Sequence, residues 1–228
     1  MPLLEVDGLS VSFTQLTRGF RETRLIALQD VGLDVDRSEI VAVIGASGSG
    51  KSLLAHAVLG ILPGNAAMSG SIRFDGKPLT TSRQEELRGR SISLIPQSVN
   101  FLDPLMRVGS QVRHSVKSGD PAAAQRSAFE RFRLPAAAAK LYPHQLSGGM
   151  ARRVLVATAT VSGAELLIAD EPTPGLDPAI MQEALATLRE LADQGAAVLL
   201  ISHDLDSALR VADRVAVLYA GTTVEVAP

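Results

Sequence analysis

Short apolar runs alternate with helical patterns along much of the chain. Runs with almost no charge predict strands that are buried on both faces. They lie at residues 40–44, 165–169, 196–201 and 214–219. Helical spacing lies between the later runs, at about residues 178–193 and 205–212. Buried strands that alternate with helices predict an α/β fold with a mostly parallel core sheet.

The N-terminal part has a different pattern. Apolar and polar residues alternate over residues 3–14, which predicts a strand pair with its turn at Asp7 and Gly8. The polar stretch at 14–24 predicts an exposed loop. Further strands are expected at 25–35 and 71–74. These strands predict an antiparallel β subdomain beside the core.

The middle of the chain is helical. After a short strand at 91–95, the pattern is helical and rich in alanine from residue 108 to 141. Prolines at 121 and 135 divide this region into short helices. We expect a single domain over residues 1–228, with a helical subdomain inserted into its α/β core at about residues 98–162.

A glycine-rich loop follows the first buried strand and precedes a helix. It matches the pattern G-x-x-x-x-G-K-[ST] in full. Glycines let backbone N–H groups approach a phosphate chain closely, and the helix N-terminus adds the positive end of its dipole. Lys51 is expected to reach the β- and γ-phosphates, and Ser52 to bind Mg²⁺. The expected nucleotide-binding residues are Gly45, Ala46, Ser47, Gly48, Ser49, Gly50, Lys51, Ser52 and Leu53.

Two carboxylates follow the strand at 165–169. A P-loop ATPase needs an acidic side chain beside Mg²⁺ at the end of a buried strand, so Asp170 is predicted to be a magnesium ligand. Glu171 is then placed to act as general base on the attacking water. His203, at the end of the next strand, is expected to reach the γ-phosphate.

A pair of glycines at a helix start indicates a second phosphate site. Ser147 is a good N-cap, and a plainly capped helix is one interpretation. Gly148 and Gly149, however, weaken the helix unless a ligand approaches the backbone there.

Composition narrows the range of partners. Lys and Arg number 22 and Asp and Glu 24, a net charge of −2, so no overall positive field favours nucleic acid as a partner. Cysteine is absent, which excludes disulfides, thiolate metal sites and cysteine nucleophiles. No signal peptide and no apolar run of about 18 residues is found, so we expect a chain that is soluble by itself.

Together these motifs resemble the ATP-binding cassette of an ABC transporter. Residues 45–52 resemble Walker A, Pro96-Gln97 the Q-loop, 146–149 the signature, 168–171 Walker B, 174–177 the D-loop and His203 the switch histidine. The resemblance covers essentially the whole chain. Residues 142–150, 166–173 and 212–221 are also similar to the importer ATPases for dipeptides, oligopeptides and nickel.

The resemblance implies that two cassettes sandwich two ATP molecules head to tail. Ser147, Gly148 and Gly149 would then contact the nucleotide held by the second cassette, which can be an identical or a different chain. Gln97 would bind Mg²⁺ and face a groove for a membrane permease subunit. Two further nucleotide contacts are implied, at Phe13 (adenine stacking, although Phe13 shares a strand face with Val11 and core packing would also explain it) and at Asp177.

The function implied is ATP hydrolysis at the cytoplasmic face of the membrane. It would power uptake of peptides, or of nickel or metal-chelate solutes, through separate permease subunits and, indirectly, a solute-binding protein. Three residues depart from the family pattern, namely Ser98, Arg152 (usually Gln) and Gly175 (usually Ala). We expect Arg152 to alter the contact with the opposed nucleotide or with the partner's surface.

Three other functions fit the sequence less well. A non-transport cassette ATPase acting on DNA or ribosomes usually has tandem cassettes or a coiled-coil insertion, together with basic surfaces. A P-loop kinase or GTPase would leave the signature and His203 unexplained. A degenerate cassette that only binds ATP within a heterodimer is opposed by the presence of Glu171 and His203.

Overall fold

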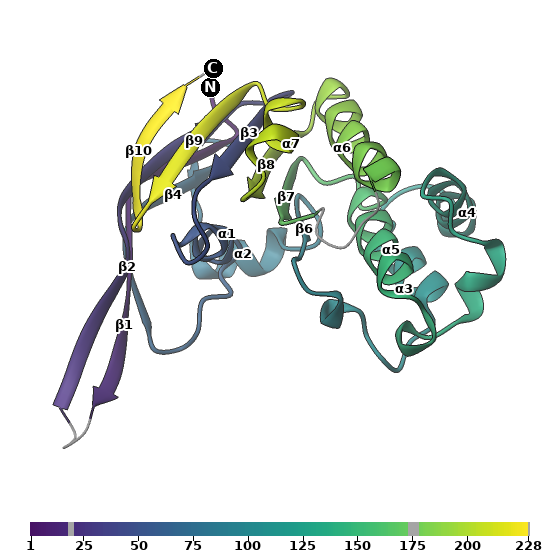
Figure 1. Ribbon diagram of the computed structural model, residues 1–228, viewed down its shortest axis with the longest axis horizontal. Helices are drawn as coiled ribbons and strands as arrows, with labels where there is room; N and C mark the ends of the chain where they lie inside the picture. The colour runs from purple at the N-terminus through teal and green to yellow at the C-terminus, as the bar shows by residue number, and fades with distance from the viewer. Residues whose placement is uncertain (18–20, 173–177, 228) are drawn as a thin grey trace.

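The computed structural model describes residues 1–17, 21–172 and 178–227 of the 228-residue chain. The strands of this part form two sheets, and helices pack beside the larger one (Figure 1). The smaller sheet is antiparallel, with strand order β2-β1-β4-β5. Its strands are β1 (Leu4–Thr17), β2 (Arg21–Val35), β4 (Ala66–Phe74) and β5 (Lys77–Pro78). The expected antiparallel sheet is therefore confirmed.

Two expectations for the first hairpin are wrong. Asp7 and Gly8 do not reverse the chain, because Gly8 takes a φ of 59° and the pairing register shifts there, so that the strand bulges and continues. Residues 14–17 and 21–24 are not a loop, since they pair in the β1–β2 ladder, with Thr14 opposite Arg24. The outer part of this hairpin projects from the body in Figure 1, where Thr14 and Arg24 are exposed, whereas Leu4, Val6, Leu9 and Val11 of the same strand β1 join the core.

The larger sheet is mostly parallel, as expected. Its strand order is β10-β9-β3-β8-β7-β6, and among these strands only β10 runs antiparallel to its neighbour. The strands are β3 (Ile40–Ile44), β6 (Ile92–Ile95), β7 (Leu166–Asp170), β8 (Ala197–Ser202), β9 (Arg214–Tyr219) and β10 (Thr222–Ala227). Strand β10 was not predicted from the sequence.

Helices flank the core sheet and form one end of the molecule. They are α1 (Lys51–Leu59), α2 (Thr81–Leu87), α3 (Val108–Ser115), α4 (Pro121–Arg131), α5 (Gly148–Thr160), α6 (Pro178–Asp193) and α7 (Leu205–Leu209). Short 3₁₀ turns lie at Val99–Phe101, Ala136–Lys140 and Pro143–Gln145. In Figure 1, α3, α4 and α5 lie together at the end opposite the β1–β2 hairpin. In the described chain, no helix combines the length and the apolarity needed to cross a bilayer.

Alternate residues of the core strands face two separate apolar clusters. Val41 and Val43 of β3 join the cluster that includes α1 and the antiparallel sheet. Ile40 and Ala42 of the same strand join the cluster built with the helical end of the molecule and α6. Because both faces of β3 are buried, its sequence is a continuous apolar run, as the pattern predicted.

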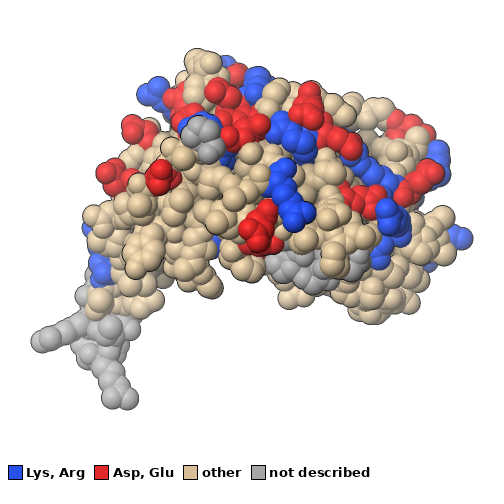
Figure 2. All heavy atoms as spheres, turned by 45° about the horizontal axis from the view of Figure 1, so that its top comes forward, with Lys and Arg blue, Asp and Glu red and all other residues tan. Residues whose placement is uncertain are grey.

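Surface charges are mixed rather than gathered by sign. Lys and Arg lie interspersed with Asp and Glu on the face that Figure 2 shows. Some are paired across the fold, such as Arg189 Nη1 with Asp213 Oδ2 at 2.7 Å. Arg214 likewise pairs with Asp34 and Glu39, and these hydrogen bonds raise the pKa of Arg214.

Candidate functional site

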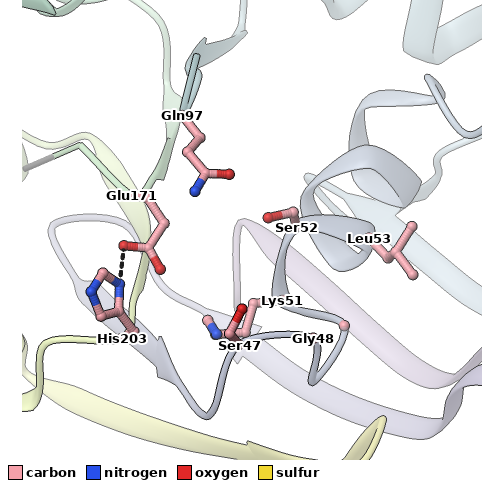
Figure 3. Close-up of a pocket in the computed structure, with 9 residues that line it drawn as sticks. Ser47, Gly48, Lys51, Ser52, Leu53, Gln97, Glu171 and His203 are labelled. Atoms are coloured by element: carbon pink, nitrogen blue, oxygen red, sulfur yellow. Dashed lines mark hydrogen bonds and ion pairs between the residues drawn. The ribbon is translucent and has the colours of Figure 1, made fainter. Parts of the chain in front are cut away.

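The residues predicted to bind or hydrolyse the nucleotide lie together where four parallel strands of the core sheet end. The glycine-rich loop follows β3, Gln97 follows β6, Glu171 follows β7 and His203 follows β8. Parallel strands in one sheet bring their carboxyl ends to the same edge. Here they surround a cavity of about 440 Å³ lined by Ser47, Gly48, Gly50, Lys51, Ser52, Leu53, Gln97, Glu171 and His203. The loop side chains face Gln97, Glu171 and His203 across this cavity (Figure 3).

The loop can bind an anion at the start of α1. Gly50 is the N-cap at φ 98°, and a Cβ there would lie 2.4 Å from Leu28 Cδ2, so only glycine fits. No side chain caps this helix start, which leaves its N–H groups for a ligand. Lys51 Nζ donates to Gly45 O at 2.8 Å and Ala46 O at 3.0 Å, and the side chain is buried. The two carbonyls are uncharged, so they hold the ammonium without balancing its positive charge. A bound phosphate would balance that charge.

Two side-chain oxygens that could bind a metal ion lie beside the loop. Ser52 Oγ donates to Asp170 Oδ1 at 3.0 Å, and Asp170 is only 4% exposed. Burial raises the pKa of the Asp170 carboxyl, while the hydrogen bond from Ser52 acts in the opposite direction. Hard oxygen donors of this kind suit Mg²⁺, whose charge would offset the burial of the carboxylate. Gln97, whose amide points towards Ser52 in Figure 3, completes the predicted set.

Glu171 and His203 form a pair on the other side of the cavity. His203 Nδ1 lies 2.6 Å from Glu171 Oε2, and Glu171 is buried whereas His203 is exposed. Glu171 has a φ of 49°, a left-handed conformation that costs a non-glycine residue about 1 kcal/mol or more. The surrounding residues therefore hold the backbone of Glu171 in an unfavourable conformation. In this conformation its carboxylate points into the cavity.

The signature residues are not brought to this cavity. Ser147 caps α5 by accepting from Met150 N at 3.3 Å, as predicted. Gly148 and Gly149 follow it, and a Cβ on either would meet nothing within 4 Å. Packing within the described chain thus gives no reason for two glycines at this helix start.

Three other predicted contacts have different outcomes. Phe13 is half-buried against the apolar cluster of the antiparallel sheet and does not line the cavity, so adenine stacking stays a prediction. Ser49 is buried, and its hydroxyl has no hydrogen-bond partner among the described residues. Asp177 and the rest of the predicted D-loop lie outside the described residues.

The expectation for Arg152 is wrong. Its side chain does not face outward to a partner but is 4% exposed. Nη1 donates to Pro96 O at 2.8 Å and to Gln97 O, and Nη2 donates to Glu171 O at 2.8 Å. Burial lowers the pKa of Arg152, against the opposing effect of the Glu171 and Asp170 charges. The sequence held a signal for this, because Arg152 lies three and four residues before Leu155 and Val156, on the buried side of α5.

Comparison with known proteins identifies the family. Residues 28–174 match the model of the ABC transporter family. The chain belongs to this family. Its cassette fold is also that of a solved ATP-binding cassette, MJ0796 bound to ADP and Pi, with a TM-score of 0.84 over 98% of this chain and 97% of that one at 23% identity.

Curated relatives narrow the family further. The chain is 38% identical, over 98% of its length, to the oligopeptide transport ATP-binding protein OppD of Mycobacterium tuberculosis, of which it spans 38%. It is 36% identical, over its whole length, to a putative peptide import ATP-binding protein of Brucella abortus, of which it spans 71%. Both names refer to peptides, and neither refers to nickel.

Proposed function

We propose that this cassette is the ATP-hydrolysing subunit of an importer for peptides. The observation that carries the proposal is the cavity at the strand ends, where a phosphate-binding loop faces the paired Glu171 and His203. The relatives' names supply the solute class. Nickel or metal-chelate uptake, the other possibility raised by the sequence, has no support from these relatives.

The residues of the cavity divide the work of hydrolysis. Lys51 and the loop amides bind the phosphates, while Ser52, Asp170 and Gln97 hold Mg²⁺, which neutralises phosphate charge during transfer. Glu171 accepts the proton of the attacking water, and His203 orients that carboxylate through Nδ1. The reaction needs mainly positioning and charge, and these side chains supply both.

A second cassette completes the site. The glycine pair at the start of α5 has no packing role in the described chain, and a phosphate held by a facing cassette would explain it. The solved relative MJ0796 is itself described as dimeric. In the assembly that we infer, the helical region at about residues 98–162 forms a subdomain, and permease subunits bind at the cytoplasmic face of the membrane.

The direct test is ATP turnover and molecular mass, by light scattering, for the wild type and Glu171→Gln. With MgATP, we expect Glu171→Gln to lose turnover by about 10²-fold or more and to accumulate as a dimer. Glu130→Gln, an exposed residue of α4, is the matched control and should keep wild-type turnover. Absence of turnover in the wild type would instead indicate a degenerate, regulatory cassette, and wild-type turnover in Glu171→Gln would show that Glu171 is not the general base.

The solute is tested in cells that carry the protein. Loss of the chain should abolish uptake of a labelled oligopeptide and leave uptake of radioactive nickel unchanged. The reverse result would replace peptides by nickel as the solute and leave the ATPase assignment intact.

A further inference from the structure

Arg152 connects three parts of the fold that contribute to the cavity. It lies on α5, the helix that begins at the signature glycines. Its guanidinium donates to the carbonyls of Pro96 and Gln97, in the segment after β6, and of Glu171, after β7. Every one of these acceptors is a backbone atom, so the contacts fix the course of the chain rather than a side-chain rotamer.

The bond to Glu171 is the most consequential of the three. Glu171 has a left-handed backbone, which relaxes unless its surroundings hold it. Its amide donates to Ile201 O at 2.9 Å, and its carbonyl accepts from Arg152 Nη2 at 2.8 Å. The peptide groups on both sides of the general base are therefore tied, one to β8 and one to α5.

Glutamine at this position could not make the same set of contacts. Its amide has two N–H donors on a shorter side chain, whereas a guanidinium has five in a rigid plane. The extra donors let one arginine bridge both strand ends at once. Its burial also needs these acceptors, because an unpaired buried guanidinium would be strongly unfavourable.

We propose that Arg152 is a positioning residue that makes α5, the Gln97 segment and Glu171 move as one unit. A displacement of α5, such as the docking of the signature glycines on a facing nucleotide, then shifts the general base and the magnesium-side glutamine together. This inference rests on the proposed ATPase function for its consequence, but the link itself is a property of the free chain.

Arg153 offers a matched control one residue further along. It also donates to three backbone carbonyls, of Gly149, Phe132 and Arg133, but all of them belong to the helical end of the molecule. Arg153→Gln removes the same kind of contact from the same helix without touching the two strand ends.

The first measurement is kinetic. For Arg152→Gln in the full chain we expect kcat to fall about 10-fold or more, while the Kd for ATP changes less than about 2-fold, because the phosphate loop is untouched. Arg152→Lys, which keeps the charge but has fewer donors, should give an intermediate kcat. Arg153→Gln should retain kcat within about 2-fold. A purely structural role would instead lower thermal stability and nucleotide binding together, with similar losses in Arg153→Gln.

The second measurement does not depend on turnover. Backbone hydrogen exchange of the nucleotide-free chain should become faster over residues 95–98 and 169–172 in Arg152→Gln, and only near residues 130–134 and Gly149 in Arg153→Gln. If Arg152→Gln does not fold, Arg152→Lys takes its place in this comparison. Wild-type exchange rates at 169–172 in the variant would overturn the proposal. If the wild type hydrolyses no ATP, the proposed function fails, and the exchange comparison still decides the role of Arg152.

Discussion

His203 Nδ1 and Glu171 Oε2 are 2.6 Å apart, although the two residues follow different strands and are separated by 32 positions in the chain. The pairing exists because β7 and β8 are parallel neighbours whose carboxyl ends coincide. The exposed imidazole therefore orients a buried carboxylate. With Nδ1 engaged in this way, Nε2 is the ring nitrogen that could donate to a phosphate oxygen, which it does only when the ring carries a proton on both nitrogens.

The pairing predicts a selective loss of chemistry in His203→Ala. We expect kcat for ATP to fall by about 10²-fold or more, because Glu171 loses its orienting partner, while ATP binding to the loop changes little. Steady-state turnover together with an equilibrium binding titration separates the two effects. His114→Ala, at an exposed position of α3, should behave as the wild type. Full turnover in His203→Ala would show that Glu171 works without the imidazole.

The buried Asp170 predicts a stability that depends on pH. Since burial raises its pKa, the native chain binds a proton more tightly than the unfolded chain does, and stability without Mg²⁺ falls as pH rises above about 4. Asp170→Asn removes this penalty. At pH 7 its Tm should exceed that of the wild type by about 2–4 °C, and the difference should shrink towards pH 4.

With Mg²⁺ present, we expect the difference in Tm between the wild type and Asp170→Asn to change sign. Wild-type chain with MgATP should gain thermal stability, whereas Asp170→Asn should gain the same small amount from ATP with or without Mg²⁺. Differential scanning calorimetry of both proteins in the two conditions checks this. Equal stabilisation of the two proteins by Mg²⁺ would mean that Asp170 does not bind the metal.

The site was easier to predict from sequence than the surfaces around it. Lys51, Asp170 and His203 lie at strand ends, and strand order in a parallel sheet brings such ends together without any detail of side-chain packing. The pairing of the outer part of the β1–β2 hairpin, around Thr14 and Arg24, could not be predicted because the side chains there are polar and exposed and the pairing is made between backbones. Arg152 was misassigned because a charge is expected at a surface, whereas its acceptors are carbonyls 19 and about 55 residues away in sequence.

Helix α2 was not predicted from the sequence either. Its residue Gln84 predicts an effect on stability. Gln84 Nε2 donates to Ala57 O at 2.7 Å and Val58 O at 3.2 Å, which are terminal carbonyls of α1. Gln84→Ala leaves these buried acceptors without that donor and should reduce the free energy of unfolding by about 1–3 kcal/mol. Urea denaturation measures the change. Glu85→Ala, the exposed neighbour, should stay within about 0.5 kcal/mol of the wild type.

The glycines at the start of α5 predict that a substitution there changes ATP turnover without lowering the stability of the fold. Gly148 has no positive φ, and a Cβ there would meet nothing within 4 Å. Gly148→Ala should therefore keep the wild-type Tm or raise it, since alanine favours a helix over glycine by up to about 1 kcal/mol. If a facing nucleotide approaches this backbone, the added methyl group obstructs it, and turnover should fall about 10-fold or more.

The measurement pairs thermal unfolding without nucleotide with ATP turnover and ATP-dependent dimerisation. Gly163→Ala is an instructive contrast, because Gly163 has a φ of 68° and open space around it, so alanine there strains the backbone. That variant should lose stability and keep its turnover at temperatures where it is folded. If Gly148→Ala hydrolyses ATP at the wild-type rate, nothing approaches the start of α5 during the reaction. The two-cassette arrangement would then have to be replaced by hydrolysis within a single chain.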